Sequence, residues 1–176
     1  MACSCTLSSL RAVAWMRKIL AIDPGNTHSG YVVVEHDGTE IRRVLDKGKV
    51  ENADVFDVIW RHSDADVAIE MVASYGMAVG AEVFDTCVWI GRFAQVAGKH
   101  TLIYRKDEKL YLCGRLNAKD ANITQALCDR FAAGQPNRGK GTARQPGFFH
   151  GFYADIWQAM AVAVTYFDKH VRGVML

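Results

Sequence analysis

The chain has 176 residues, of which 50% are hydrophobic and 23% are charged, a balance that excludes a disordered chain and predicts one globular domain. Lys and Arg number 21 and Asp and Glu number 19, so the net charge of +2 excludes a polybasic nucleic-acid-binding tail. No apolar run reaches the ~18 residues of a membrane span, so no membrane partner is expected.

The first 15 residues differ from the rest, because they contain one basic residue and no acidic residue. Met16 then opens the segment MRKILAIDPG, which is typical of a natural protein start. We therefore interpret residues 1–15 as a dispensable N-terminal extension and residues 16–176 as a single domain. Two alternatives remain for residues 1–15: a weak targeting peptide, which would direct the protein to an organelle, and a first turn of helix.

The cysteine pattern predicts a reducing compartment. The chain has five cysteines, an odd number that argues against a disulfide framework in a chain of this length. Cys3 and Cys5 form a pair, but no second Cys or His pair follows at the spacing of a zinc site. We therefore expect a cytoplasmic protein.

Hydrophobic patterning predicts regular elements from residue 18 onward. Strands at 18–23, 30–35 and 41–50 are separated by turn signals at 24–25 and 36–38, and they form an antiparallel meander. A short helix at 53–61, a strand at 66–72, a helix at 81–98 and a strand at 101–104 follow. A helix at 117–132 and a glycine-rich loop at 134–151 precede a closing helix at 153–170, which is apolar almost all round and so predicted to be buried.

This order predicts an α/β fold with a mixed five-stranded sheet, in which three antiparallel strands are followed by βαβ units and helices cover both faces. In the helix at 81–98, one stripe of residues recurs at three- and four-residue steps and is expected to face the core. That stripe consists of Phe84, Cys87, Val88, Gly91 and Ala94.

Three carboxylates interrupt apolar runs: Asp23 ends the first strand, Glu70 lies within VAIEMVA, and Asp155 lies near the start of the last helix. Buried carboxylates are costly unless they are paired or bind a metal. Each also has a structural alternative, namely a turn residue for Asp23, a helix cap for Asp155 and an ion pair for Glu70.

Convergence of these carboxylates would form a metal site. The ends of neighbouring strands can meet beneath the start of a helix that crosses the sheet. Three carboxylates there suit Mg²⁺ or Mn²⁺, and two such ions would activate a water and stabilise the leaving oxygen of a phosphodiester.

The same segments resemble a known family. ILAIDPGNTHSGYVVVE is similar to the opening of the RuvC-type Holliday-junction resolvases, which belong to the RNase H-like (retroviral integrase) superfamily. VAIEMV resembles the second acidic strand of that family and DIWQAMAVAV its final acidic helix, so the similarity covers residues 16–167. The resemblance implies an RNase H-like nuclease domain over residues 16–176. It also implies a crossover junction endodeoxyribonuclease of DNA recombination and repair, in the cytoplasm of a bacterial or phage-infected cell.

The resemblance carries catalytic and metal-binding roles to Asp23, Glu70 and Asp155. The last helix of the family usually offers two ligands three residues apart, which places Gln158 at the second position. Gln158 departs from the family, because an amide oxygen can ligate a cation but brings no charge. A register shifted by three residues would make Asp155 the second ligand, with His150 as an auxiliary ligand.

The resemblance also implies two catalytic lysines that steady the scissile phosphate, Lys109 before LYLC and Lys119 at the start of a helix. Both belong to a basic group that is expected to bind branched DNA, and a basic, glycine-bearing loop suits contact with the DNA backbone. The alternative for each such residue is a solvated surface position. The expected DNA-binding residues are Tyr75, Arg105, Lys106, Lys109, Arg115, Lys119, Arg138, Lys140 and Arg144.

A four-way junction has approximate two-fold symmetry and its resolution takes two matched cuts, so a homodimer is expected. Trp89, Phe93 and Val96 lie off the expected core stripe of the helix at 81–98, and we predict that they form the contact between copies. The alternative is a helix with a broad buried face.

Three other functions remain alternatives. A non-catalytic nucleic-acid-binding module with a decayed metal site is favoured by Gln158. A second alternative is a nuclease of the same superfamily that acts on RNA–DNA hybrids or other branched substrates. An actin-like phosphotransferase is disfavoured by length, because that fold needs two such domains.

Overall fold

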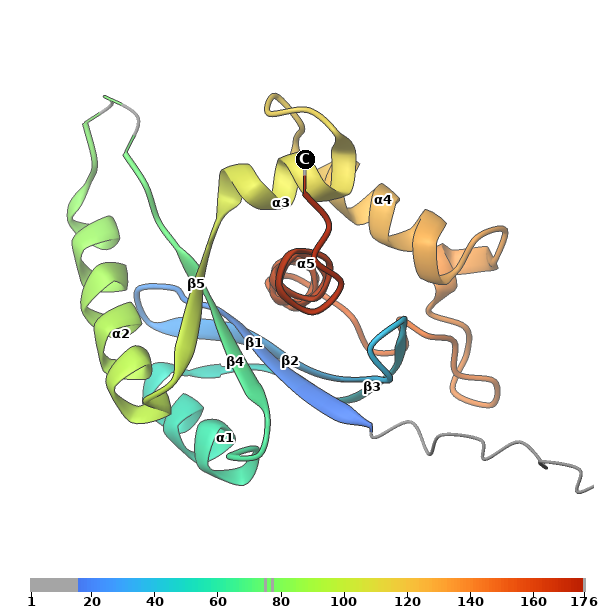
Figure 1. Ribbon diagram of the computed structural model, residues 1–176, viewed down its shortest axis with the longest axis horizontal. Coiled ribbons are helices and arrows are strands. Elements are labelled where there is room, and N and C mark those ends of the chain that lie inside the picture. The colour runs from blue at the N-terminus through green and yellow to red at the C-terminus, as the bar shows by residue number, and fades with distance from the viewer. Residues whose placement is uncertain (1–15, 75, 77, 176) are drawn as a thin grey trace, which may run out of the picture.

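The computed structural model describes residues 16–74, 76 and 78–175. The predictions for residues 1–15 and for Tyr75 therefore lie outside the described residues. A five-stranded sheet with the order β3-β2-β1-β4-β5 forms the centre of the molecule (Figure 1). Strands β1 (Arg17–Asp23), β2 (His28–His36) and β3 (Ile41–Glu51) are antiparallel, and β4 (Asp66–Met71) and β5 (His100–Tyr104) extend the sheet in parallel with β1.

Helices cover both faces of this sheet, as the sequence predicts. α1 (Val55–Arg61) and α2 (Ala81–Ala97) pack on one face. On the other face α5 (Ile156–Tyr166) lies between the sheet and the outer helices α3 (Arg105–Cys113) and α4 (Asp120–Phe131), and Figure 1 shows it almost end-on. Short 3-10 turns at Asn52–Asp54 and Pro136–Gly139 and a π turn at Phe167–Val171 complete the elements. None of the helices described is long and apolar enough to cross a membrane.

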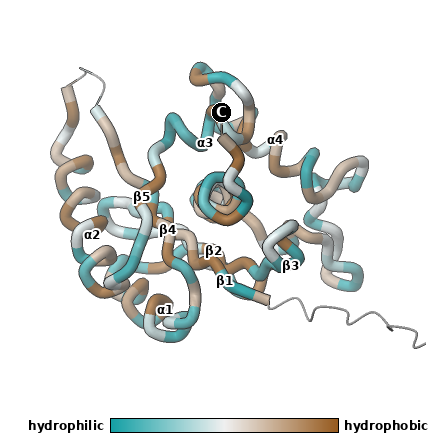
Figure 2. The backbone as a smooth tube through the Cα atoms, viewed as in Figure 1, coloured by the Kyte–Doolittle hydropathy of each residue, from teal (hydrophilic) through white to brown (hydrophobic). Residues whose placement is uncertain are grey.

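The alternation of each strand assigns its residues to one of two cores. Figure 2 shows the hydrophobic stretches of β1 and β2 at the centre of the molecule, between the helical layers. Ala21 of β1 and Ala68 of β4 pack toward α5, whereas Leu20 packs toward α1 and α2. Asp23 and Glu70 lie two residues further along the same strands, so both carboxylates face the α5 side of the sheet.

The closing helix is buried as predicted but shorter. α5 begins at Ile156 and ends at Tyr166, and nine of its 11 residues are buried because the sheet covers one side and α3 and α4 the other. Asp155 is therefore the residue that precedes the helix, at the edge of the buried layer.

The helix α3 is absent from the sequence prediction. The segment Arg105–Cys113 begins with RKDEK, which is so polar that no apolar period reveals a helix. Gly114 ends the helix in a left-handed conformation with φ of 65°, as glycines at helix ends commonly do. Arg105, Lys106 and Lys109 of the predicted basic group thus lie on a helix over the α5 side of the sheet.

The predicted core stripe of α2 is wrong except at Ala94, which packs against the core. Phe84 and Val88, which were expected to be buried, are 61% and 53% exposed. The predicted interface residues pack inward instead, since Trp89 and Phe93 lie with their ring centroids 6.2 and 5.9 Å from that of Phe56 in α1. The α2 residues that are buried or packed against this core include Thr86, Trp89, Ile90, Phe93 and Val96. Periodicity alone could not orient α2, because apolar residues occur on both of its sides.

Candidate active site

One row across the sheet carries the charged residues of the site. The register of β1 with β4 places Asp23 beside Glu70. On its other side Asp23 pairs with Gly30 of β2, and Gly30 pairs with Lys49 of β3. Because directly paired residues project from the same face of a sheet, Lys49, Asp23 and Glu70 all face the α5 layer. The row thus holds two adjacent carboxylates, a gap at Gly30 and an ammonium group.

Gly30 makes room for Asp155. A Cβ atom at Gly30 would lie 2.7 Å from the backbone carbonyl group of Asp155 and 2.8 Å from its Cβ, so a larger residue would push the start of α5 away from the sheet. Ala154, just before Asp155, has a φ of 39°, a left-handed conformation that costs a non-glycine residue about 1–3 kcal/mol. The backbone is therefore strained where it presents Asp155 above the row.

The Asp155 carboxylate does not cap its helix. Asp155 is the N-cap residue of α5, yet its side chain makes no capping hydrogen bond. Instead, Oδ2 of Asp155 forms an ion pair with Nζ of Lys49 at 2.7 Å. The helix-cap alternative for Asp155 is excluded, and its carboxylate belongs to the charged row.

A fourth carboxylate, Glu108 of α3, lies near Glu70. Glu108 is fully buried, and its Oε2 accepts a hydrogen bond from Nη1 of Arg105 at 2.6 Å, while its Oε1 has no hydrogen-bond partner among the described residues. Nη1 of Arg105 also lies 3.9 Å from Oε1 of Glu70, and Nη2 donates to Oδ1 of Asp120 at 2.6 Å. The Arg105 guanidinium, which was expected to bind DNA, is thus shared among three carboxylates.

Burial and the neighbouring carboxylates raise the pKa of Asp23 and that of Glu108. Burial, and then the adjacent Glu70 carboxylate, raises the pKa of Asp23 well above its usual range, and Asp155 adds to this effect. Burial followed by Glu70 also raises the pKa of Glu108, although Arg105 opposes the shift. Burial lowers the pKa of Arg105, but the neighbouring Glu108 and Glu70 carboxylates outweigh this effect, so the pKa is raised overall. The site therefore concentrates negative charge beyond what its own cations neutralise.

These residues fit a divalent cation by their chemistry. Carboxylate oxygens are the ligands that Mg²⁺ and Mn²⁺ prefer. Gln158, one turn after Asp155, has a buried Oε1 atom without a hydrogen-bond partner in the part of the chain that the structure describes. The side chains do not form a closed ligand shell, since no three His, Cys, Asp or Glu side chains among residues 16–74, 76 and 78–175 are grouped to hold an ion. Binding of an ion would therefore require these carboxylates to draw closer together.

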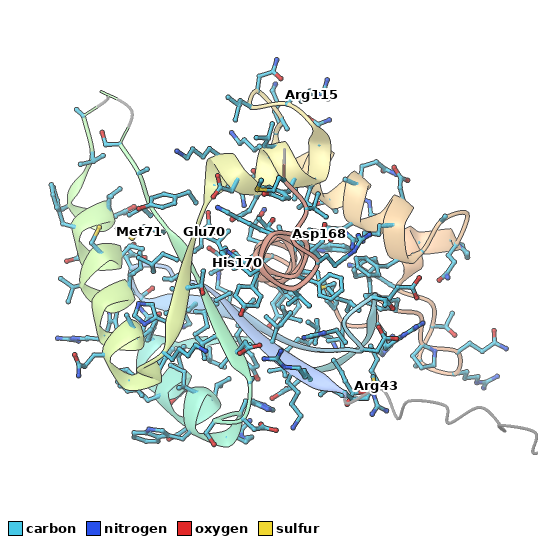
Figure 3. The ribbon with its side chains drawn as sticks, viewed as in Figure 1. Arg43, Glu70, Met71, Arg115, Asp168 and His170 are labelled. Atoms are coloured by element: carbon cyan, nitrogen blue, oxygen red, sulfur yellow. The ribbon has the colours of Figure 1, made fainter. Side chains whose placement is uncertain are left out.

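The other predicted residues of α3 and α4 lie outside this row. Lys106 and Lys109 line, with Arg105 and Leu116, an open cavity of about 310 Å³. Lys119 is exposed at the N-cap of α4, where its backbone N–H donates to the Asn122 side chain at 2.9 Å. Figure 3 shows Arg115 in the loop after α3, projecting away from the sheet, whereas Glu70 lies near the point where β5 leads into α3.

The loop at 134–151 is folded on itself. The N–H of Gly147 donates to the Lys140 carbonyl oxygen at 3.1 Å, and that of Phe149 donates to the Gly139 carbonyl oxygen at 3.0 Å. His150 is exposed, and its Nδ1 lies 3.2 Å from the same Lys140 oxygen, so the structure gives its ring a backbone contact. Arg138 and Arg144 are exposed, and Lys140 is half-buried.

Sequence reasoning missed Lys49 and Glu108. Lys49 could have been found by pairing the predicted strands, because a lysine opposite Gly30 must face the same side as Asp23. Glu108 gave no signal, since RKDEK is indistinguishable from a solvated helix face.

Asp23→Asn is expected to stabilise the metal-free protein. A carboxyl group whose pKa is raised in the folded state makes stability fall as pH rises from its usual pKa to the raised pKa, because the folded state holds the proton more tightly. The amide removes this penalty, so Tm in chelator at neutral pH should rise by about 2–4 °C, which corresponds to roughly 1 kcal/mol in a domain of this size. The rise in Tm, measured by calorimetry, should be smaller in acid. Asp57→Asn changes an exposed residue of α1 and is the control, which should show no rise in Tm at either pH.

The sequence matches no protein-family profile, and no curated protein matches it either. The fold is nevertheless of the RNase H-like class, with the mixed five-stranded sheet and two helical layers described above. Within that class the chain has the fold of RuvC. It is similar to RuvC from Thermus thermophilus with a TM-score of 0.62 and 22% identity, over 89% of this chain and 96% of that one.

A second solved structure, T. thermophilus RuvC in complex with a Holliday junction substrate, gives a TM-score of 0.63 and 20% identity over the same shares of the two chains, 89% and 96%. At these identities the likeness establishes the fold, and the predicted fold class is confirmed.

Proposed function

We propose that the chain is a divalent-metal-dependent endodeoxyribonuclease that resolves four-way DNA junctions. The observation that carries this proposal is the position of Asp23, Glu70 and Asp155. Asp23 and Glu70 lie at the carboxyl ends of neighbouring parallel strands, and Asp155 lies over the Gly30 gap beside them. In open α/β sheets, ligands bind outside the carboxyl ends of the parallel strands. T. thermophilus RuvC, which has the same fold, has been solved in complex with a Holliday junction substrate, and this supports branched DNA as the ligand.

Each residue near the row has a separate role in this proposal. Asp23, Glu70 and Asp155 hold the cation through carboxylate oxygens, and Gln158 offers a neutral oxygen. When bound, the cation polarises a phosphoryl oxygen and lowers the pKa of a water. Arg105 keeps Glu70 oriented by pairing with it and with Glu108 at once.

The basic surface has the role of holding the DNA backbone. Lys106 and Lys109 on α3 neutralise phosphates near the acidic row, and the exposed Lys119 extends that surface onto α4. Arg138 and Arg144 of the loop at 134–151 offer a second, more remote set of cations. Arg105 is left out of this surface because its guanidinium is occupied by carboxylates.

The proposal is tested by incubating the full chain with a synthetic four-way junction, a linear duplex and an RNA–DNA hybrid, each with Mg²⁺, Mn²⁺ or chelator. Paired nicks in the junction that need metal are expected. Preferential cleavage of the hybrid would instead indicate a different RNase H-like nuclease. Tight junction binding without cleavage in either metal would indicate a non-catalytic binding module, the second candidate, which the uncharged Gln158 favours.

We infer that the protein is a homodimer and that the exposed face of α2 forms the contact. Phe84 and Val88 lie one helical turn apart and are 61% and 53% exposed, and the nearby Val79 is 38% exposed. Phe84→Glu combined with Val88→Glu is expected to convert the dimer to a monomer in light-scattering chromatography, without loss of helical circular dichroism. Trp60→Glu, which changes an apolar residue of α1 that is 63% exposed, is the matched control and should stay dimeric. A monomeric wild-type chain would contradict the inference.

Gln158→Asp is expected to lower the Mg²⁺ concentration for half-maximal cleavage at least ~10-fold. A negative charge about 4 Å from a cation is worth several kcal/mol before desolvation, at an effective dielectric constant near 20. Junction affinity in chelator should change little. Gln158→Leu, which removes the amide oxygen, should raise the metal requirement. An unchanged requirement in both variants would place Gln158 away from the metal and favour the register in which Asp155 is the second helical ligand.

A further inference from the structure

Lys49 introduces a positive charge into an otherwise acidic row. It is the β3 residue opposite Gly30, and its Nζ forms an ion pair with Oδ2 of Asp155 at 2.7 Å. The two side chains are 34% and 37% exposed, so the ion pair lies at the rim of the site and not deep in the core. Lys49 thus contacts one of the three carboxylates that would hold a cation.

The backbone directs Lys49 to Asp155. Gly30 has no side chain, so nothing from β2 separates Lys49 from the start of α5, which lies directly over Gly30. The Asp155 side chain makes no capping hydrogen bond at the start of α5. Its carboxylate is therefore available to Lys49, and the strained Ala154 holds it above the row.

The charges of the row match one divalent cation. Asp23, Glu70 and Asp155 bring three negative charges and Lys49 returns one positive charge, which leaves the charge that a single divalent ion neutralises. Glu108 adds no free charge, since Arg105 bonds to it at 2.6 Å, and Gln158 is neutral. A second divalent ion would have to bind beside Lys49 without a further unpaired carboxylate among the described residues of the row to balance it.

We propose that Lys49 is a built-in counter-cation of Asp155, so that the site binds one divalent ion where two would be expected from the carboxylates alone. Lys49 is a positioning residue in this arrangement, because it acts through the Asp155 carboxylate. The inference rests on the proposed function for the identity of the site, and it concerns the number of ions that the site takes.

The inference is tested by counting Mn²⁺ ions on the DNA-free full chain with electron paramagnetic resonance and calorimetry. Wild type is expected to bind one Mn²⁺ per chain. Lys49→Met should bind the first ion at least ~10-fold more tightly and should accept a second, whereas Lys49→Arg should resemble wild type. Lys47→Met is the matched control, because Lys47 lies on the same face of β3 and its Nζ lies over the Phe152 ring, 5.8 Å from the ring centroid. This variant should keep one ion.

Each other outcome overturns the inference. A wild-type chain that binds two Mn²⁺ ions, or none, contradicts it without any variant. Lys49→Met with one ion at unchanged affinity and weakened junction binding would make Lys49 a phosphate contact instead. The proposed function fails separately: a wild-type chain with one ion and no junction cleavage would contradict the nuclease and leave the Lys49 inference standing.

Discussion

Asp155→Asn should lower the rate of junction cleavage at least ~10²-fold in saturating Mg²⁺, and Asp23→Asn and Glu70→Gln should do the same. Each change removes one ligand charge while keeping the size of the side chain. Junction affinity in chelator should be unchanged or higher, because a negative charge near the DNA phosphates is lost. Single-turnover cleavage and junction binding, measured on the same preparations, separate the two effects.

Asp57→Asn provides the matched control for these three variants. Asp57 is an exposed carboxylate on α1, on the opposite face of the sheet, so the same change of charge should leave cleavage unaltered. Full cleavage by Asp155→Asn would remove Asp155 from the site. Equal loss of binding and cleavage in all three variants, together with a lowered Tm, would indicate a folding defect.

The sheet could be predicted because its information is local. Runs such as KILAID and VAIEM are short, apolar and bounded by turn residues, and their alternation assigns each residue to a face. Asp23 and Glu70 stood out for the same reason, since each interrupts a pattern that burial otherwise explains. Asp155 stood out because the helix after it is apolar on all sides.

The remaining parts of the site could not be predicted because they depend on contacts distant in the sequence. Glu108 is buried only because α3 lies over α5, and a polar helix start gives no sign of that packing. Lys49 matters through its position opposite Gly30 and its bond to Asp155, residues far along the chain. The orientation of α2 was likewise decided by aromatic packing of Phe93 and Trp89 against α1, which overrode an equally good stripe at Phe84 and Val88.

Arg105→Met should destabilise the protein by about 3 kcal/mol, since removal of one partner of a buried ion pair leaves an uncompensated charge. Glu108 is fully buried, and one of its oxygens already has no hydrogen-bond partner in the described part of the chain, so water cannot replace Arg105 there. Chemical denaturation at neutral pH measures the loss. Arg105→Lys should also be destabilising, because one ammonium group cannot reproduce contacts that the guanidinium makes through two nitrogens to Glu108, Glu70 and Asp120.

The pH dependence of stability should identify Glu108 as the source of the stability lost in Arg105→Met. Without Arg105, the pKa of Glu108 loses its main lowering influence, so the folded state holds the Glu108 proton still more tightly. Stability then falls as pH rises through the raised pKa, and the cost of Arg105→Met should shrink in acid, where Glu108 is neutral. Combining Arg105→Met with Glu108→Leu should restore most of the stability, because a buried ion pair can be replaced by apolar side chains at little cost. A double variant as unstable as Arg105→Met would instead assign the cost to the lost contacts with Glu70 and Asp120.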